Sequence, residues 1–388
     1  MVAVGDLAVH TRARTPAALD PGWNNVISPN GSSGVYLGNR WVITAGHVMV
    51  PASVPIGGIL FEVESNSDVR MRRLDNADWA DLQLFRLKTA PALPAIALID
   101  SPLAVGTEIT LIGFGGWCGE AAAFDANWNS VPVEASAPYT GYWRSGWGKC
   151  WGTNRVSGIT DFDDGAGLAR VYTAVFDAPG AGSDATADEA LIAPSDSGGA
   201  IFAQVNGQWR LAGTMIDLAV VGGRNWFLPI AVHGDWTYAV ELAAYRPQID
   251  AVLACATQYD VWQYKIFRGT ATSVTADPDG DGFTNLEEYA YGLDPKVRNP
   301  RSAAPQIGFS AYADGSALTV TFTRNKLATD ALPVVEVSDD LVTWSSGAGA
   351  TVELPSVALA GDVERATVRD ATPLAKAPRR FLRVRVAR

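Results

Sequence analysis

Residues 193–201 read APSDSGGAI, a tight glycine-rich turn that presents the hydroxyl of Ser197 just before an apolar run. Residues 41–48 read WVITAGHV and place His47 directly after a second apolar run rich in β-formers. A serine hydroxyl is a weak nucleophile and needs a neighbouring base to remove its proton. The chain has 3 histidines, which nearly forces the choice of His47 as that base.

A third group must orient the histidine and stabilise its charge, and a carboxylate serves this purpose. Residues 76–87 read NADWADLQLFRL, in which Asp81 stands at the start of an apolar strand pattern. Asp81 is therefore expected where a loop enters the core, and Asp78 is the second candidate. The predicted constellation is His47, Asp81 and Ser197, in that order along the chain.

These motifs resemble those of the chymotrypsin/trypsin-like serine proteases, over roughly residues 20–255. The resemblance implies that Ser197 is the nucleophile, that His47 is the general base and then the general acid, and that Asp81 orients His47. It also implies an oxyanion hole formed by the backbone N–H groups of Ser195 and Ser197. The family usually has glycine at the position of Ser195, because the chain must turn its amide toward the oxyanion there.

In the family, the carboxylate at the position of Asp196 pairs with a new N-terminus that cleavage of a precursor creates. No matching sequence precedes His47 in this chain. Either another group, such as an internal arginine, pairs with Asp196, or the native N-terminus differs from the one given. An unpaired buried carboxylate is costly, so some partner is expected.

The resemblance also bears on the specificity pocket. Leu191 lies where a preference for arginine or lysine needs an acidic residue. Ungapped matching places Leu218 on the pocket wall, where the family often has glycine, and Ile216 where a serine usually bonds the triad aspartate. These residues predict a pocket for small to medium apolar side chains.

Composition bounds the classes of function. With 30 Lys and Arg against 41 Asp and Glu, the 388-residue chain has a formal net charge of −11, which argues against nucleic-acid binding. No apolar run reaches the length of a membrane helix, and no signal peptide is visible at the start. A secreted bacterial protein with its signal removed is the expectation. Cys118 and Cys150 could close a loop by a disulfide, with Cys255 left as a free thiol.

Short apolar runs alternate with turn signals along the first two thirds of the chain, the pattern of an all-β barrel or sandwich. For residues 23–255 the resemblance implies a double six-stranded antiparallel β-barrel with the site in the cleft between the barrels. His47 and Asp81 would lie on the first barrel and Ser197 on the second.

The remaining segments divide by pattern. Residues 1–22 are expected to form an N-terminal arm, and the helical spacing over 236–254 predicts a helix that closes the protease-like domain. Residues 256–300 are expected to be a linker. Residues 301–388 alternate cleanly between apolar and polar side chains and predict a small β-sandwich module, for which a cell-surface or glycan ligand is possible.

The predicted linker contains an acidic loop, in which residues 277–288 read DPDGDGFTNLEE. This matches the 12-residue EF-hand-type loop, whose oxygen ligands suit Ca²⁺. The predicted ligands are Asp277, Asp279, Asp281, the carbonyl of Phe283, Asn285 and Glu288. The loop resembles those of thrombospondin type 3 repeats and dockerins, which implies a structural calcium ion. A solvated acidic linker without metal is the alternative.

The sequence thus predicts a secreted serine endopeptidase that acts on protein or peptide substrates through an acyl-enzyme on Ser197. The alternative from another class is a weakly active or inactive protease-like adhesion or binding protein that acts through its C-terminal module. An esterase with the same triad is disfavoured, because Ser195 stands where the Gly-x-Ser-x-Gly elbow needs its first glycine.

Overall fold

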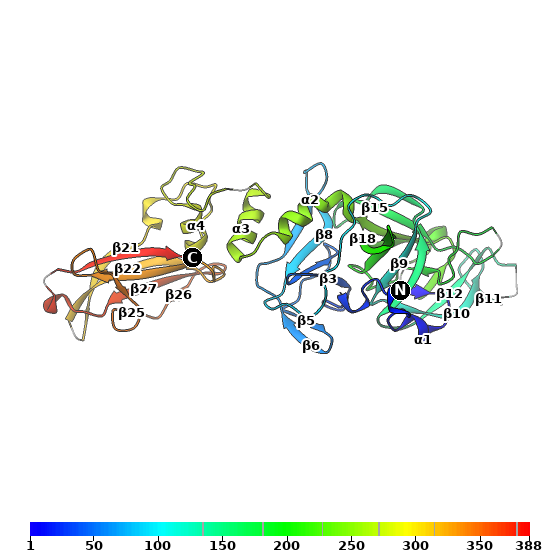
Figure 1. The fold of residues 1–388 in the computed structure, drawn as a ribbon, viewed down its shortest axis with the longest axis horizontal. Helices are drawn as coiled ribbons and strands as arrows, with labels where there is room; N and C mark the ends of the chain where they lie inside the picture. Colours follow the sequence, from blue (N-terminus) through cyan, green and yellow to red (C-terminus); the bar gives the residue numbers. More distant parts are fainter. Residues whose placement is uncertain (134–135, 181, 227, 271, 314, 378) are drawn as a thin grey trace. The chain divides into compact units, whose positions relative to one another are not determined.

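The computed structural model describes residues 1–388 except 134–135, 181, 227, 271, 314 and 378. The chain consists mostly of β-strands with few helices, and it divides into two compact units, Met1–Ala254 and Cys255–Arg388 (Figure 1). The predicted linker and the predicted C-terminal module therefore lie within one unit. Among the described residues, no helix has the length and apolar character needed to cross a membrane.

A five-stranded antiparallel sheet in the first unit carries the segments of His47 and Asp81. Its order is β2 (Val26–Ile27), β3 (Gly34–Gly38), β4 (Trp41–Thr44), β8 (Trp79–Arg86) and β7 (Val69–Arg72). Strands β3 and β4 are buried along their whole length, as expected of nearly continuous apolar runs. His47 follows β4, and Asp81 lies in β8, which pairs with β4. The sheet thus brings the two segments together.

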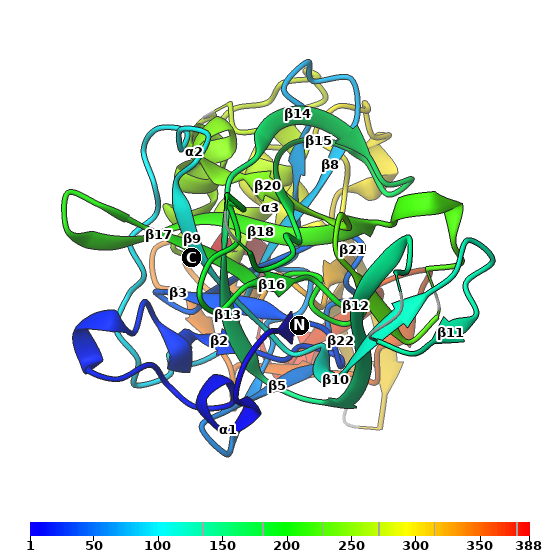
Figure 2. The same cartoon turned by 90° about the vertical axis from the view of Figure 1, so that its right-hand side faces the viewer.

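A seven-stranded antiparallel sheet carries the segment of Ser197. Its order is β13 (Cys150–Arg155), β9 (Glu108–Gly113), β17 (Ala200–Val205), β18 (Gln208–Ala219), β20 (Trp236–Glu241), β15 (Leu168–Val175) and β14 (Gly158–Asp163), and it can be followed in Figure 2. Ser197 lies in the turn before β17. In the described part of the chain the strand order of this sheet is open, so the predicted pair of closed six-stranded barrels stays a prediction.

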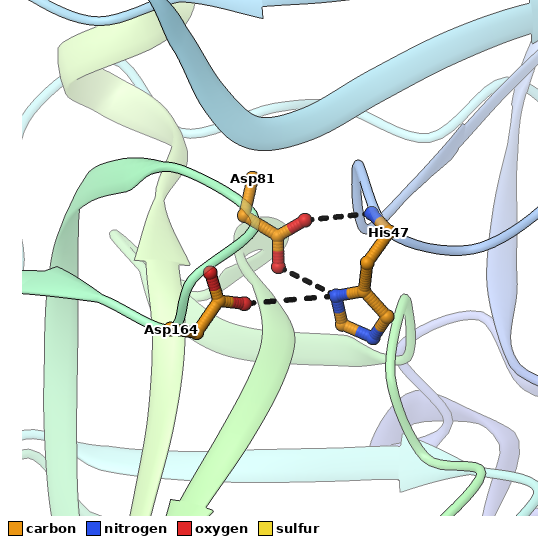
Figure 3. Close-up of side chains that lie close together, drawn as sticks. All are labelled: His47, Asp81 and Asp164. Carbon is orange, nitrogen blue, oxygen red and sulfur yellow. Dashed lines mark hydrogen bonds and ion pairs between the residues drawn. The ribbon is translucent and has the colours of Figure 1, made fainter.

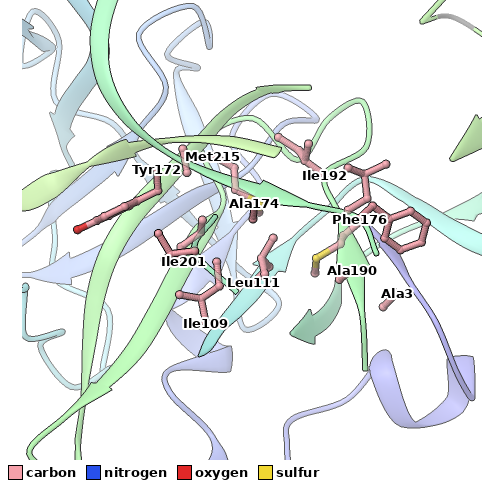
Figure 4. Close-up of a cluster of buried hydrophobic side chains, with 14 of the residues drawn as sticks. Ala3, Ile109, Leu111, Tyr172, Ala174, Phe176, Ala190, Ile192, Ile201 and Met215 are labelled. Atoms are coloured by element: carbon pink, nitrogen blue, oxygen red, sulfur yellow. The ribbon is translucent and has the colours of Figure 1, made fainter. Parts of the chain in front are cut away.

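The core of the first unit packs on this sheet (Figure 4). Ile109 and Leu111 of β9, Ile201 of β17 and Met215 of β18 are buried there, each at most 1% exposed. Burying an aliphatic side chain of this size contributes about 1.5–3 kcal/mol. The turn that carries Ser197 is therefore anchored by strands whose positions this core fixes.

The first residues of the chain are part of this core, in contrast to the expected arm. Strand β1 (Val2–Ala3) pairs with β16 (Ala190–Leu191), and Met1 and Val2 are fully buried. The short helix α1 (Leu7–His10) follows. The apolar start of the chain can be buried because β16 supplies backbone partners, and a run this short carries no periodic signal in the sequence.

The first unit also contains smaller sheets and short helical turns. A four-stranded sheet has the order β11 (Ser130–Val131), β10 (Gly116–Phe124), β12 (Tyr139–Trp147) and β19 (Ile230–Val232), and β5 (Ser53–Ile56) pairs with β6 (Ile59–Glu62). Single 3-10 turns lie at Ala17–Leu19, Trp23–Asn25 and Val221–Gly223.

The closing helix is shorter than the predicted range 236–254. Helix α2 spans Leu242–Leu253, with Pro247 inside it. The six residues before it form β20, which pairs with both β18 and β15. The helical spacing of apolar residues holds only from Leu242 onward, and sheet pairing decides the conformation before it.

The described residues of the second unit form two sheets and two helices. One sheet has the order β21 (Gln306–Tyr312), β22 (Gly315–Asn325), β27 (Val363–Asp370) and β25 (Thr351–Glu353), with β26 (Val357–Ala358) also on β27. The other has the order β24 (Ser345–Ser346), β23 (Leu332–Ser338) and β28 (Phe381–Ala387). Apolar side chains from both sheets share one core. Helices α3 (Gln258–Phe267) and α4 (Asn285–Tyr291) precede the sheets, and 3-10 turns lie at Arg301–Ala303 and Leu374–Lys376.

Candidate active site

His47 and Asp81 are bonded to each other through both the backbone and the ring of the histidine (Figure 3). The backbone N–H of His47 donates to Asp81 Oδ1 at 2.7 Å, and the ring Nδ1 lies 2.8 Å from Asp81 Oδ2. Asp81 is fully buried. Gly46 permits this approach, because a Cβ there would lie 2.9 Å from Asp81 Oδ1. Asp78, the second candidate, is exposed and does not take this place.

A second carboxylate, which the sequence did not reveal, faces the same ring nitrogen (Figure 3). Asp164 lies in the turn between β14 and β15, and its Oδ2 is 3.7 Å from Nδ1 of His47. Its Oδ1 accepts hydrogen bonds from the backbone N–H groups of Ala166 at 2.8 Å and Gly167 at 3.2 Å. These bonds fix the carboxylate beside the histidine. In the sequence, Asp-Gly at this point signals only a turn.

The two carboxylates set the electrostatics of the histidine. Burial disfavours the charged ring, but the hydrogen bonds and charges of Asp164 and Asp81 outweigh it and raise the pKa of His47 to about 10. Burial also raises the pKa of Asp81, and the neighbouring Asp164 adds to this effect. Asp164 is itself desolvated, yet its hydrogen bonds prevail and lower its pKa. The site therefore favours an imidazolium ring held by carboxylate.

Ser197 lines the same cleft as His47. Its Oγ donates a hydrogen bond of 3.2 Å to the carbonyl of Ile216. No hydrogen bond joins Ser197 and His47 among the described residues. Catalytic hydrogen bonds in ligand-free sites are often long and tighten only when substrate binds. The family resemblance placed Ile216 beside the triad aspartate. In the structure its backbone carbonyl accepts the hydrogen bond of the Ser197 hydroxyl.

The backbone around Ser197 leaves two donors available. None of the hydrogen bonds within the described chain uses the N–H of Ser195 or of Ser197. Ser195 has φ 74°, in the left-handed region that glycine usually occupies. Ser33 supports the turn, since its N–H donates to the Ser197 carbonyl at 2.8 Å and its Oγ donates to the Ser195 carbonyl at 3.0 Å. Gly198 has φ 86°, and a Cβ there would lie 1.9 Å from the carbonyl oxygen of Ser33.

Asp196 has the partner that its burial requires. Its carboxylate is fully buried, and the α-ammonium of Met1 lies 2.5 Å from its Oδ2. The backbone N–H of Gly115 donates to Oδ1 at 2.7 Å, and that of Ala193 donates to Oδ2 at 2.8 Å. One carboxylate thus joins the turn before Ser197, the segment after β9 and the first residue of the chain.

The cleft beside Ser197 has a volume of about 300 Å³. Apolar side chains form much of its wall, among them Ile192, Pro194 and Leu218. Leu218, the residue predicted for the pocket wall, is one of the side chains that line this cleft. Leu191 instead is buried in β16, which pairs with β1, and packs within the core of the unit.

The acidic loop of the second unit fits a cation. One oxygen atom from each of Asp277, Asp279 and Asp281 lies within 4.8 Å of the others. Glu288 is fully buried, and both of its carboxylate oxygens have no hydrogen-bond partner, nor do Asp279 Oδ2 and the Asn285 side-chain oxygen. Buried oxygens without donors are costly unless a cation satisfies them. Burial and the surrounding carboxylates raise the pKa of Glu288 to about 8.

Helices precede and follow the acidic loop. Helix α4 begins at Asn285 within the loop, and Thr284 caps it. Helix α3, which the sequence analysis missed, ends at Phe267, ahead of the loop. Its Thr257 to Asp260 capping box was the available sequence signal.

The disulfide that the sequence left open between Cys118 and Cys150 is not formed, because Cys118, Cys150 and Cys255 are all free thiols. Cys118 lies in β10 and Cys150 in β13, which belong to different sheets. Burial raises the pKa of Cys118 to about 11 and that of Cys150 to about 12. Both thiols are thus kept in the unreactive protonated form.

No family model matches the chain, and no curated protein matches it. Among solved structures, the chain is similar to the NS6 protease of murine norovirus 1, with 15% identity, a TM-score of 0.30, and coverage of 56% of this chain and 90% of that one. An extended form of murine norovirus NS6 protease gives 14% identity, a TM-score of 0.32, and coverage of 56% and 92%. The HtrA-type protease AlgW with a decapeptide gives 13% identity, a TM-score of 0.34, and coverage of 58% and 52%.

Proposed function

We propose that the protein is a serine endopeptidase of trypsin-like fold. One observation carries the proposal: His47, bonded through Nδ1 to the buried Asp81, shares a cleft with Ser197, beside which two backbone N–H groups have no acceptor. Nucleophile, base, orienting acid and oxyanion donors are the four parts that acyl transfer needs.

The residues take the following roles. Ser197 Oγ attacks the carbonyl carbon of the peptide bond while its proton passes to Nε2 of His47. The N–H groups of Ser195 and Ser197 stabilise the oxyanion, and losing one such donor costs on the order of 3 kcal/mol. His47 then protonates the leaving amine, which yields an acyl-enzyme on Ser197. Water activated by His47 hydrolyses the ester and returns the proton to Ser197.

Asp81 and Asp164 act on the charged form of His47 in this scheme. A bond from Nδ1–H to a carboxylate fixes the ring tautomer and stabilises the imidazolium that forms when Ser197 attacks. A second carboxylate strengthens the charged form further. The base must be neutral before it can accept a proton, so we expect the activity to increase toward alkaline pH.

The apolar cleft supports the choice of substrate. Side chains such as Ile192, Pro194 and Leu218 suit a small to medium apolar side chain at the cleaved bond. Secretion and a pair of closed six-stranded barrels belong to the same proposal, since both follow from the family resemblance.

Labelling by a fluorophosphonate tests the nucleophile directly, because the reagent modifies only an activated serine. We expect one modified residue, Ser197, and no labelling of Ser197→Ala. Labelling should be measured from pH 7 to about pH 10. A folded wild-type protein that stays unlabelled over this range would show that the serine is not activated.

A structural calcium site is the second part of the proposal. The ligands are Asp277, Asp279, Asp281, the Phe283 carbonyl, Asn285 and Glu288. The orphaned oxygens of Glu288, Asp279 and Asn285 support it. When bound, the ion supplies a positive charge that lets these oxygens converge without repulsion. The loop residues hold the start of α4 against the segment before it, and we assign no catalytic step to them.

A weakly active or inactive binding protein remains the second candidate function, with the C-terminal module as the binding part. The observation that favours it is the strong preference of His47 for its charged form, which cannot act as a base. Fluorophosphonate labelling that stays absent up to about pH 10 would favour this candidate.

A further inference from the structure

The cleft beside Ser197 holds a carboxylate that the proposed mechanism does not use. Asp217 lies in β18, next to Ile216, and lines the same cleft as His47 and Ser197. Its Oδ1 accepts a hydrogen bond of 2.8 Å from the backbone N–H of Leu218. No ion pair between Asp217 and a lysine or arginine exists within the described chain.

The surroundings of Asp217 make its negative charge unfavourable. Burial in the cleft and the charge of Asp164 raise the pKa of Asp217, against the opposing effects of the Leu218 N–H and His47. A half-buried carboxylate with one donor and no lysine or arginine partner among the described residues lacks much of the solvation it has in water. A positive charge brought next to it restores a favourable environment.

The described residues that line the cleft include no lysine or arginine, and the charge of His47 is already held by Asp81 and Asp164. Of the described residues that line it, only His47, Asp164 and Asp217 are ionisable. Asp164 already faces His47, whereas Asp217 has no charged partner of its own. The other lining side chains are mostly apolar, as on Ile192 and Leu218. A cleft of this kind combines apolar walls with one unpaired negative charge.

We propose that Asp217 is a specificity-determining residue that selects substrates with a lysine or arginine next to the apolar residue at the cleaved bond. This inference rests on the proposed peptidase function. The basic side chain pairs with Asp217, and its apolar neighbour packs on walls such as Leu218. Because His47 acts at the cleaved bond and lines the same cleft as Asp217, a group bound to Asp217 belongs to a substrate residue close to that bond.

The test compares two fluorogenic peptides that differ only in lysine or norleucine directly before an apolar residue at the cleaved bond. We expect wild type to have a higher kcat/KM for the lysine peptide by about 10- to 100-fold, the range of a charge-assisted contact. Asp217→Asn should bring the ratio of the two kcat/KM values close to one by slowing the lysine peptide alone. An unchanged ratio, or no preference in wild type, overturns the inference.

Asp161→Asn is the matched control. Asp161 lies in β14 with an exposed side chain, 4.0 Å from Arg170, and does not line the cleft. The substitution removes the same charge from the chain, so it reports any effect of net charge on a cationic peptide. We expect the lysine preference to persist in this variant. Loss of the preference in Asp161→Asn as in Asp217→Asn would overturn the role of Asp217.

A binding measurement that needs no catalysis distinguishes failure of the proposed peptidase function from failure of the Asp217 subsite. The same two peptides, labelled with a fluorophore, are titrated against Ser197→Ala by fluorescence polarisation. Tighter binding of the lysine peptide that is lost in Ser197→Ala with Asp217→Asn supports the subsite even if fluorophosphonate fails to label the wild type. Equal binding of both peptides overturns the subsite even if Ser197 is labelled.

Discussion

Asp164 and His47 approach each other at 3.7 Å, between a carboxylate oxygen and the ring Nδ1. That nitrogen already lies 2.8 Å from the buried carboxylate of Asp81. Two carboxylates therefore face the same ring nitrogen, and both stabilise the charged form of His47. The consequence is a base whose neutral form is scarce at neutral pH, since the pKa of His47 is raised to about 10.

Asp164→Asn should shift the pH dependence of kcat/KM. Wild-type His47 is mostly protonated below about pH 10, so its activity should rise with pH through the alkaline range. Removing one carboxylate lowers the pKa of His47, and the acidic limb should move to lower pH by about 1 unit or more. Activity at neutral pH should therefore increase. Profiles of kcat/KM against pH measure this.

Asp163→Asn serves as the control for that shift. Asp163 precedes Asp164, is exposed, and accepts the backbone N–H of Gly165, a bond that asparagine can keep. Its profile should coincide with wild type. If Asp164→Asn lost activity equally at every pH and the acidic limb of its kcat/KM profile did not move, the electrostatic role would be contradicted. Asp164 would then have a purely structural role.

Ser195→Gly should stabilise the protein without abolishing activity. Ser195 has φ 74°, and the left-handed region costs a residue with a Cβ about 1–2 kcal/mol. Part of this gain is lost to the larger chain entropy of glycine in the unfolded state, so we expect about 0.5–1 kcal/mol in the free energy of unfolding. Ser195→Ala keeps its Cβ and should stay near wild type. Urea unfolding that ranks glycine below alanine contradicts this.

Calcium should raise the Tm of the full chain, and a chelator should reverse the effect. Ligand binding to the folded state alone stabilises it by mass action. Glu288→Gln removes the charge of the predicted bidentate ligand and should weaken calcium binding by at least about 10-fold. Glu287→Gln is the control, because Glu287 caps α4 through Thr284 and is no predicted ligand. Calorimetry that detects no calcium binding in wild type contradicts the site.

The thiols should all titrate as free. Denatured, unreduced protein should react with about three equivalents of a thiol reagent, as expected from the three free cysteines. A reducing agent should leave the Tm of the native protein unchanged, because no cross-link constrains its unfolded state. A count near one, rising to three after reduction, would restore the disulfide.

The sequence predicted the elements of the site that have local signals. His47 follows an apolar strand and Asp81 lies within one, so pattern alone located both. The sequence did not predict Asp164 as a site residue, because it lies in an aspartate-glycine turn. Only the pairing of β14 with β15 forms that turn at the histidine. Asp217 was not predicted either, because a single acidic residue within a strand gives no sequence signal of a functional role.

Pairing between distant strands also explains where the observed fold differs from the fold predicted from the sequence. Met1 lies beside Asp196 because β1 (Val2–Ala3) pairs with β16 (Ala190–Leu191), a strand far away in the sequence. Cys118 lies in β10 and Cys150 in β13, and these strands belong to different sheets. Neither relation follows from composition or spacing.

Cleavage of an unstructured protein such as casein tests the central claim most directly. Wild type and Ser197→Ala are compared with calcium present, at neutral pH and near pH 10, where the neutral form of His47 becomes common. The account predicts cleavage by wild type that is faster at the higher pH, and none by Ser197→Ala. Equal cleavage by both proteins, or none by a folded wild type at either pH, would contradict it.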